Sequence, residues 1–340
     1  MKILSIDTSC DETAAAVTEG TKVLSNVVWS QASLHAKWGG IVPSLAQRMH
    51  KERIDFVVQK ALANCKLKIE NCDCVAVTVG PGLSIALGVG VDKARELAKK
   101  YKKKLIAVNH VEAHLLSPLA NSRFQILDSS FPAYGLCVSG GNTIFVLIEK
   151  IGRYEILAQT VDDALGEALD KGARMLGLGY PGGAILEKFA RLGDPKAYTL
   201  PIPILGQEKR KIFTYSGLKT AMYRLAENQK PLTKEKIQNL AATFQDTAFK
   251  HLIRVISHII KNLDFKPTDF LIGGGVAANV EVRKRLRKLS KEFGIKALFP
   301  YSNRLYGDNA AMIGIAAYFK AQRGEFIDPD KIDRNPRLRL

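Results

Sequence analysis

The same succession of short apolar runs and amphipathic stretches occurs twice along this chain, and this repetition constrains the fold more than any other feature. Apolar alternation predicts strands, and a spacing of three to four residues predicts helices. In the first half we expect strands near residues 2–7, 13–19 and 22–30, a helix at 44–64, a strand at 75–79, a helix at 86–101, a strand at 105–108 and a helix after 109.

The second half begins after a loop at 119–131 and follows the same order with a longer middle part. The expected elements are strands near 133–138, 143–149 and 154–160, an insert at about 165–235, a strand at 270–272, a helix at 279–291, a strand at 296–299 and a helix at 308–322. The insert looks helical and contains the glycine-rich segment 177–183. Two copies of β-β-β-α-β-α-β-α predict an α/β protein of two lobes with a central cleft.

This pattern also gives the expected domain boundaries. We predict an N-terminal lobe at 1–120, a second lobe with the helical insert at 121–327, and a basic tail at 328–340. A chain of 340 residues suits two such lobes, since single cores seldom exceed about 250 residues.

The formal net charge of +17 is large, and the basic residues are clustered. The clusters are Lys99–Lys104, Lys209–Lys211, Arg283–Lys288 and the Arg334, Arg337 and Arg339 of the tail. Clustered cations with little acidic compensation favour a polyanionic partner such as nucleic acid. The alternative is that lysine-rich helix faces only keep the protein soluble.

Neither a secretory signal nor a membrane span is expected. Asp7 follows a first apolar run too short for a signal peptide, and no stretch approaches the roughly 20 apolar residues of a membrane helix. We therefore expect a cytoplasmic protein. The five cysteines predict no disulfide framework, although Cys65, Cys72 and Cys74 leave a metal knuckle as a minor alternative.

Three glycine-rich or small-residue turns follow strands at comparable places in the two halves. They lie at Asp7–Glu12, at Val138–Thr143 and at Gly273–Asn279. Exposed backbone N–H groups in such turns suit phosphate oxygens, and glycine lets a flat base approach the backbone. Each turn alone is more often a simple hairpin, but together they favour a nucleotide in the cleft.

The segment Asn109–His114 carries two histidines at i and i+4, which on a helix share one face. Asn109 is expected to cap that helix, and Pro118 to mark its end. The corresponding helix start in the second half carries Asp308, which we expect to reach the cleft from the other lobe as a third ligand. Two imidazoles and one carboxylate suit Fe(II) or Zn with open positions.

Two other interpretations of the pair remain: an accidental surface or core pair, and a metalloprotease. The protease motif needs glutamate directly after the first histidine. Here Glu112 lies one position later and would turn away from the metal.

These residues together resemble the bacterial branch of the TsaD family, the tRNA N6-adenosine threonylcarbamoyltransferases formerly called glycoprotease-like proteins. The matching segments are Asp7–Thr13, His35–Ala46, Gly80–Gly82, Tyr215–Thr220 and Asp308–Met312. The resemblance implies the duplicated actin-like and sugar-kinase-like (RNase H-like) ATPase fold. It also implies His110, His114 and Asp308 as metal ligands.

For the substrate, the resemblance implies threonylcarbamoyl-AMP bound by Val138, Ser139, Gly140, Gly141, Asn142, Asp170, Gly183 and Asn279. Asn142 stands where bacterial members usually carry histidine. The implied reaction is transfer of the threonylcarbamoyl group to the N6 amine of adenosine 37 in tRNAs that read codons beginning with A. The metal would be Fe(II), with Zn as the alternative, and Asp11 or Glu12 would act as general base.

The implied partners are tRNA, a TsaB-like paralogue, a TsaE-like ATPase and a TsaC-type enzyme that makes the donor. The main alternative function is a small-molecule kinase or ATPase of the sugar-kinase superfamily, because the fold and turns would serve it equally. A non-catalytic scaffold is a further alternative. The histidine pair disfavours the kinase, since Mg-ATP sites prefer oxygen ligands, and it disfavours the scaffold, since a paralogue of that kind would lack the histidines.

Overall fold

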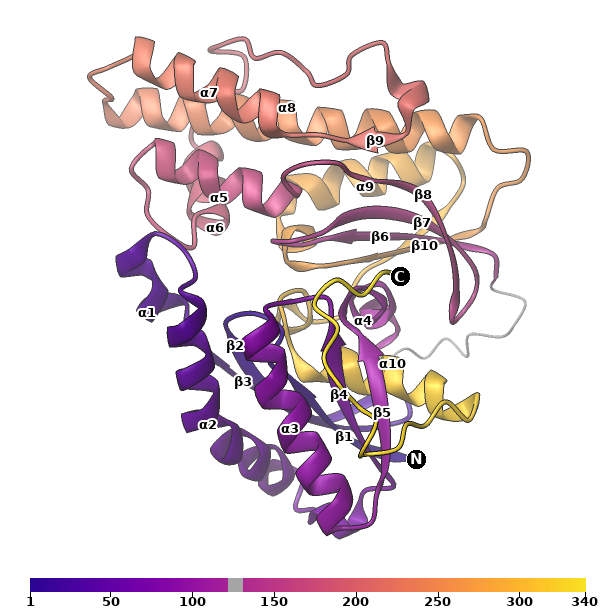
Figure 1. Ribbon diagram of the computed structural model, residues 1–340. Helices are drawn as coiled ribbons and strands as arrows, with labels where there is room; N and C mark the ends of the chain where they lie inside the picture. The colour runs from indigo at the N-terminus through magenta and orange to yellow at the C-terminus, as the bar shows by residue number, and fades with distance from the viewer. Residues whose placement is uncertain (122–130) are drawn as a thin grey trace. The chain divides into compact units, whose positions relative to one another are not determined.

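The computed structural model describes residues 1–121 and 131–340, so most of the loop expected at 119–131 lies outside the described residues. The chain divides into two compact units (Figure 1). Unit 1 contains the described residues of Met1–Leu127 together with Phe299–Leu340, and unit 2 contains those of Asp128–Leu298.

Unit 1 is built on a five-stranded sheet with the strand order β3-β2-β1-β4-β5. Its strands are β1 (Lys2–Asp7), β2 (Glu12–Glu19), β3 (Lys22–Ser30), β4 (Cys74–Gly80) and β5 (Lys104–Asn109). The first three strands pair antiparallel, whereas β1, β4 and β5 run parallel. The carboxyl ends of these parallel strands therefore lie along one edge of the sheet.

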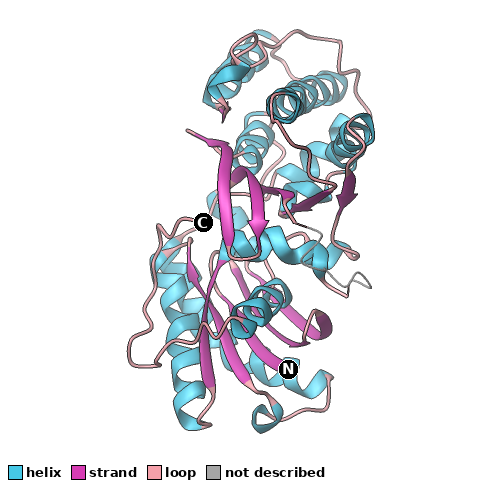
Figure 2. Cartoon of the chain, turned by 90° about the vertical axis from the view of Figure 1, so that its right-hand side faces the viewer, coloured by secondary structure: helices cyan, strands magenta, loops and turns pink. Residues whose placement is uncertain are grey.

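Helices cover both faces of this sheet (Figure 2). On one face, α2 (Pro43–Asn64) and α3 (Ser84–Lys100) pack on the core side chains of alternate residues, such as Leu4 and Ile6. On the other face lies α10 (Ala310–Gln322), whose Ala310 carbonyl accepts a hydrogen bond of 2.6 Å from Ser5 Oγ. The alternation of β1 residues between the two faces explains why its strand is buried throughout. Short helices α1 (Ala32–His35) and α4 (His110–Leu116) complete the unit.

Unit 2 repeats the strand order with one added strand at the edge, β11-β10-β6-β7-β8-β9. The strands are β6 (Ala133–Val138), β7 (Thr143–Lys150), β8 (Arg153–Thr160), β9 (Ile212–Phe213), β10 (Asp269–Gly273) and β11 (Lys296–Leu298). The helices are α5 (Leu165–Met175), α6 (Gly183–Ala190), α7 (Ser216–Asn228), α8 (Lys234–Lys261) and α9 (Val280–Glu292). Tyr134, Phe145 and Phe270, from three neighbouring strands, contact one another in its core.

The predicted duplication is confirmed, because β1-β2-β3-β4-β5 and β6-β7-β8-β10-β11 have the same order and directions. The two-residue strand β9 was not predicted, since so short a segment carries no alternation. The observed division also differs from the expected one: residues 299–327 were assigned to the second lobe but belong to unit 1. The reason is that α10 is apolar on nearly all sides and packs against β1 and β2 of the first sheet.

The basic tail expected at 328–340 has a defined course in the structure. Residues 326–340, called the arm below, lie along unit 1, where Ile332 is 2% exposed within the core (Figure 1). Among the described residues, no helix is both long and apolar enough to cross a membrane.

Candidate metal and substrate-binding residues

Three candidate groups lie where the parallel strands of unit 1 end. Asp7 is the last residue of β1, Gly80 ends β4, and His110 directly follows β5. Asn109 caps α4 as predicted, since its Oδ1 accepts from the N–H groups of Val111 (2.8 Å) and Glu112 (3.2 Å). This cap starts the helix at His110 and thereby directs the histidine pair along one helix face.

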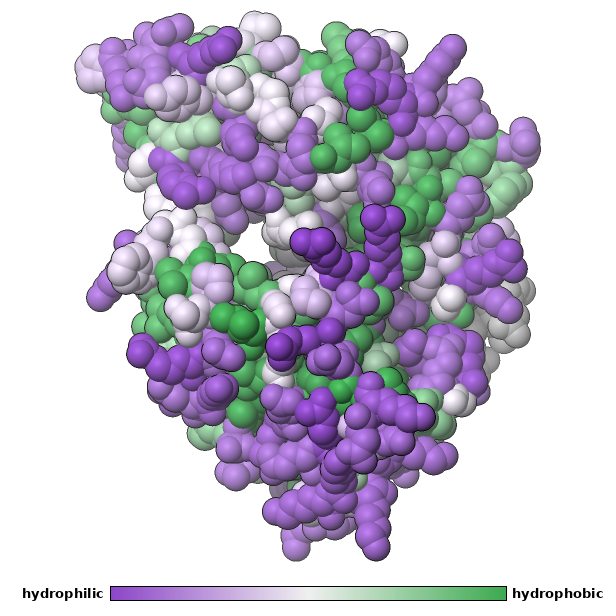
Figure 3. Space-filling model, in the orientation of Figure 1, coloured by the Kyte–Doolittle hydropathy of each residue, from purple (hydrophilic) through white to green (hydrophobic). Residues whose placement is uncertain are grey.

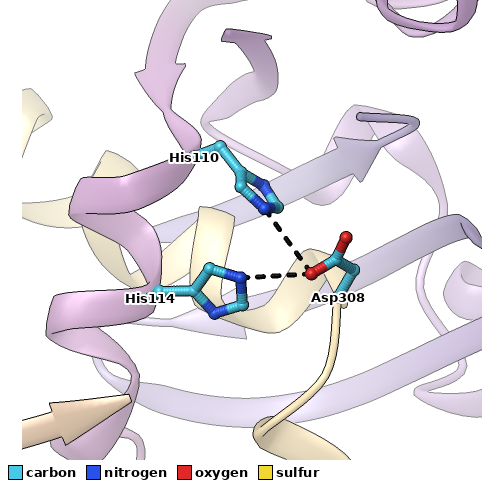
Figure 4. Close-up of side chains that lie close together, drawn as sticks. All are labelled: His110, His114 and Asp308. Carbon is cyan, nitrogen blue, oxygen red and sulfur yellow. Dashed lines mark hydrogen bonds and ion pairs between the residues drawn. The ribbon is translucent and has the colours of Figure 1, made fainter. Parts of the chain in front are cut away.

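His110 and His114 converge on one carboxylate oxygen (Figure 4). Asp308 Oδ1 lies 3.1 Å from His114 Nε2 and 3.5 Å from His110 Nε2. The ligand atoms of the three residues lie within 4.8 Å of one another, and both histidines are buried. Of the described residues, only this group has such an arrangement, so the alternative knuckle of Cys65, Cys72 and Cys74 is not formed.

The donor set and its spacing fit a divalent metal ion. Two atoms that each bind an ion at about 2.1 Å lie about 3.0–3.5 Å apart when their bonds meet at about 90–110°. The two Nε2–Oδ1 separations fall in this range. Two imidazoles and a carboxylate are ligands of Fe(II) and Zn, so the group could hold either ion.

The charges within the group are strongly coupled. Burial alone would lower the pKa of His110, but the Asp308 and Asp7 carboxylates outweigh it and raise this pKa to about 9. Burial and the neighbouring His110 lower the pKa of His114. Burial opposes ionisation of Asp308 as well, yet the two imidazoles hold its pKa well below the usual range. The carboxylate is thus ready to act as an anionic ligand.

Asp308 comes from unit 1 itself and not, as expected, from the other lobe. It precedes Asn309, which caps α10 by accepting from Met312 N–H at 3.1 Å. Close docking of α10 fixes this position, because a Cβ on Gly314 would meet Thr18 Oγ1 at only 2.7 Å. All three candidate ligands therefore belong to a single folded unit.

Asp7 is a neighbouring residue that sequence reasoning did not select. It is fully buried, its Oδ1 accepts from Ser9 N–H at 3.1 Å, and its Oδ2 lies 3.8 Å from His110 Nδ1 without a hydrogen-bond partner. A carboxylate facing the second nitrogen of a metal-binding histidine orients that ring. Its position directly after a buried parallel strand was the available signal.

Asp11 and Glu12 lie at the turn between β1 and β2, and the buried His50 bonds the residues on either side of them. His50 of α2 donates from Nε2 to the Cys10 carbonyl (3.0 Å), so its Nδ1 accepts from the Thr13 hydroxyl (2.8 Å). Glu12 Oε1 accepts from Ser30 Oγ at 3.1 Å. Burial, with Asp11 and Asp308 adding negative charge, raises the pKa of Glu12 well above its usual range.

In unit 2, the expected substrate-binding turn Val138–Asn142 joins β6 to β7. Ser139 and Asn142 close it with a backbone hydrogen bond of 2.8 Å, and Gly140 and Gly141 face open space. The start of α5 packs directly on this turn, because Gly166 N–H donates to the Ser139 carbonyl at 3.2 Å. A Cβ on Gly166 would meet that carbonyl oxygen at 2.5 Å, so only glycine fits there.

Asp170 and Gly183 also lie together, since Asp170 Oδ1 accepts from the N–H groups of Gly182 (2.9 Å) and Gly183 (2.6 Å). Asp170 is on α5, the helix that contacts the turn, so these predicted residues form one neighbourhood in unit 2. Asp170 Oδ1 thus orients the start of α6.

Asn279, the remaining predicted residue, caps α9. Its Oδ1 accepts from Glu281 and Val282 N–H, and its Nδ2 donates to Gln245 Oε1 at 2.8 Å. It follows the Gly273–Ala278 turn, where Gly274 has φ of +95° and a Cβ would lie 2.3 Å from the Val138 carbonyl. Because Gly274 has no side chain, the Gly273–Ala278 turn can lie directly against Val138, the first residue of the Val138–Asn142 turn.

Solved structures with a similar fold define the class. The component A of Acidaminococcus fermentans (R)-2-hydroxyglutaryl-CoA dehydratase aligns with a TM-score of 0.54 at 14% identity, covering 95% of this chain and 99% of that one. T. kodakarensis HypF aligns with a TM-score of 0.60 at 13% identity, covering 95% of this chain and 48% of that one. The chain thus has the two-unit, actin-like and sugar-kinase-like ATPase fold, and within it a histidine-carboxylate group that could hold a metal.

Relatives identify the family within this class. The sequence model of TsaD, tRNA N6-adenosine threonylcarbamoyltransferase, matches residues 22–315. Enzymes of that name from Bartonella henselae and Brucella ovis are 41% and 42% identical, each covering 100% of this chain and 94% of the relative. The chain therefore belongs to the TsaD family and is a transferase that forms the t6A modification of tRNA. The kinase, protease and scaffold alternatives are not retained.

Proposed function

We propose that this enzyme takes the threonylcarbamoyl group from threonylcarbamoyl-AMP and places it on N6 of adenosine 37, in tRNAs that read codons beginning with A. The observation that carries the proposal is the buried group of His110, His114 and Asp308 at the carboxyl edge of the parallel strands. Two imidazoles are poor ligands for the Mg²⁺ of Mg-ATP, which prefers oxygen, but with a carboxylate they suit an ion that activates a carbonyl donor.

We assign one divalent metal to His110, His114 and Asp308, Fe(II) first and Zn as the alternative. When bound, such an ion supplies a Lewis acid that polarises the donor's carbonyl. The protein's own part is to fix the ligands before the metal arrives. Asn109 caps α4, which carries both histidines, and Asn309 caps α10, which follows Asp308.

The bond changes in the proposed transfer are simple. The N6 nitrogen of adenine forms a bond to the carbamoyl carbon, the bond from that carbon to the phosphate oxygen of AMP breaks, and AMP leaves with the electron pair. The N6 nitrogen must lose one proton. Because an exocyclic amine is a poor nucleophile, a base at this proton accelerates the step.

We assign that proton to Glu12 or Asp11. The turn that carries them is held in place by the hydrogen bond from His50 Nε2 to the Cys10 carbonyl. Burial, with the negative charges of Asp11 and Asp308, raises the pKa of Glu12, and a raised pKa makes its carboxylate a stronger base.

We assign the AMP part of the donor to unit 2. The turn Val138–Asn142 offers the exposed Gly140 and Gly141 for close approach of a phosphate. Asp170, Gly183 and Asn279 complete the proposed set, with Asp170 and Gly183 in direct contact with each other.

The reaction is tested by incubating the enzyme with synthetic threonylcarbamoyl-AMP and an unmodified tRNA transcript, and by measuring t6A in the digested RNA. We expect t6A with the wild-type enzyme and none after metal removal. His110→Ala should lose activity, whereas the matched variant His258→Ala, at the end of α8, should keep it. Full activity of His110→Ala would overturn the metal assignment, and transfer to a transcript with guanosine at position 37 would overturn the target.

We further propose that the enzyme works with a TsaB-like paralogue, a TsaE-like ATPase and a TsaC-type enzyme that supplies the donor. Membership of the TsaD family supports this. Turnover measured with and without each purified partner tests it, and unchanged multiple-turnover rates in their absence would contradict it.

A further inference from the structure

The arm, residues 326–340, is held against unit 1 along its whole length. Ile327 N–H donates to the Leu105 carbonyl of β5 at 2.9 Å, which adds an isolated antiparallel bridge. Arg95 of α3 then donates to the carbonyls of Pro329 (3.1 Å) and Ile332 (2.7 Å). The first half of the arm therefore has a fixed course.

The second half of the arm crosses the carboxyl ends of β4 and β5. Asn335 N–H donates to the Val79 carbonyl at 2.6 Å, and Asn109 Nδ2 donates to the Arg339 carbonyl at 2.9 Å. The approach at the end of β4 is so close that a Cβ on Gly80 would lie 1.8 Å from the Asn335 oxygen. Figure 1 shows this part of the arm in yellow, running past β4 and β5 toward α4.

The arm buries apolar side chains against unit 1 and exposes two arginines near its end. Ile332 and Leu338 pack with the core of unit 1, whereas Arg337 and Arg339 are exposed. Within the described ranges, neither arginine forms an ion pair, although many other cations of the chain do, such as Lys99 with Asp330 and Arg95 with Asp92. Two positive charges thus have fixed backbones and no protein counter-charge.

The end of the arm, with Arg337 and Arg339, lies beside the start of α4, the helix that carries His110 and His114. Screening limits the reach of an exposed charge to about 8 Å at physiological salt, so only cations close to this edge of the sheet act on a nucleic acid bound there. The Arg339 carbonyl is bonded to Asn109, the residue that precedes His110.

We propose that the arm forms part of the tRNA-binding surface, with Arg337 and Arg339 contacting backbone phosphates of the anticodon stem-loop. The inference rests on tRNA being the substrate and specifies the surface that binds it. Guanidinium groups suit this role because they bind phosphate through two N–H groups at once. Exposed contacts of this kind fix the position of the RNA and are independent of its sequence.

The test compares Arg337→Gln/Arg339→Gln with Lys66→Gln/Lys68→Gln. Both remove two positive charges from unit 1, but Lys66 and Lys68 are exposed between α2 and the amino end of β4, away from His110 and His114 and outside the basic clusters. Hydrophilic residues gather over that end of unit 1, at the bottom of Figure 3. The measurement is the affinity for a fluorescent anticodon stem-loop between about 50 and about 200 mM salt, together with zinc titration.

For Arg337→Gln/Arg339→Gln we expect binding to weaken roughly tenfold and the slope of log affinity against log salt to fall by about 2. Zinc affinity should stay unchanged, and Arg337→Lys/Arg339→Lys should recover most of the slope. The control variant Lys66→Gln/Lys68→Gln should bind the RNA like the wild type. Equal weakening by both glutamine variants, or no change in either, would overturn the proposal; absence of t6A formation by the wild type would instead reject the proposed function.

Discussion

Asn109 stabilises α4, the helix that carries His110 and His114, through two kinds of hydrogen bond, and replacing it by different residues distinguishes their contributions. The Asn109 side chain accepts hydrogen bonds from two N–H groups of α4 and donates one to the arm at Arg339. The helix has only seven residues, and so short a helix is not stable alone. Its order must therefore come from packing and from these hydrogen bonds.

Asn109→Ala and Asn109→Ser should lower the free energy of unfolding by different amounts. Asn109→Ala loses the cap, at about 1 kcal/mol, and the hydrogen bond to the arm, at about another 1 kcal/mol. Asn109→Ser keeps an equivalent cap and loses only the hydrogen bond to the arm. For a domain of this size, each kcal/mol corresponds to roughly 2–4 °C in melting temperature. We expect decreases of about 4–8 °C for alanine and about 2–4 °C for serine.

Thermal unfolding followed by circular dichroism, with and without zinc, measures both effects. Since His110 is the first residue of α4, zinc should raise the melting temperature of Asn109→Ala less than that of the wild type. Equal melting temperatures for the alanine and serine variants would refute the capping argument. A serine variant as stable as the wild type would refute the contribution of the arm.

Three further predictions concern residues around the two sheets. Asp7→Asn should weaken zinc binding by about 10–100-fold, because Asp7 faces His110; competition with a chromogenic chelator measures this, and an unchanged affinity contradicts it. Gly314→Ala should lower stability by about 1–3 kcal/mol in denaturant unfolding, since its Cβ would meet Thr18. Burial lowers the pKa of His251 from 6.5 to about 4, so the unfolded chain binds the extra proton and stability is lost as pH falls. Urea unfolding should show a loss of about 1 kcal/mol between about pH 7 and about pH 5.5, and a smaller one in His251→Gln.

Local patterns in the sequence were sufficient for the strands other than β9, most helices and the histidine pair. The spacing of His110 and His114 is a property of one short helix, and Asn109 caps it as expected. The repeated succession of strands and helices was visible without tertiary information, whereas the order of the strands within each sheet was not predicted.

The placement of α10 could not be predicted in the same way. Its apolar residues and its boundaries are local, but the sheet on which it packs depends on shape, such as the bare surface that Gly314 offers to Thr18. Asp308 was therefore assigned to the wrong side, although its partnership with the histidines was anticipated. The docking of the basic tail on unit 1 was not predicted for a related reason: its charged, proline-containing sequence does not show where it binds, and the close approach of Asn335 to Gly80 is a tertiary contact.

These tertiary contacts make the metal group and the arm energetically dependent on each other. Asn109 is bonded on one side to α4, which carries both histidines, and on the other to the Arg339 carbonyl. Anything that orders the arm favours the capped form of α4, and a metal that requires ordered His110 favours the docked arm. Such coupling is reciprocal: if tRNA binds the arm and a metal binds the histidines as proposed, each strengthens the binding of the other by the same factor. On this proposal, the short side chain of Asn109 connects the chemistry at the histidines to recognition of the RNA.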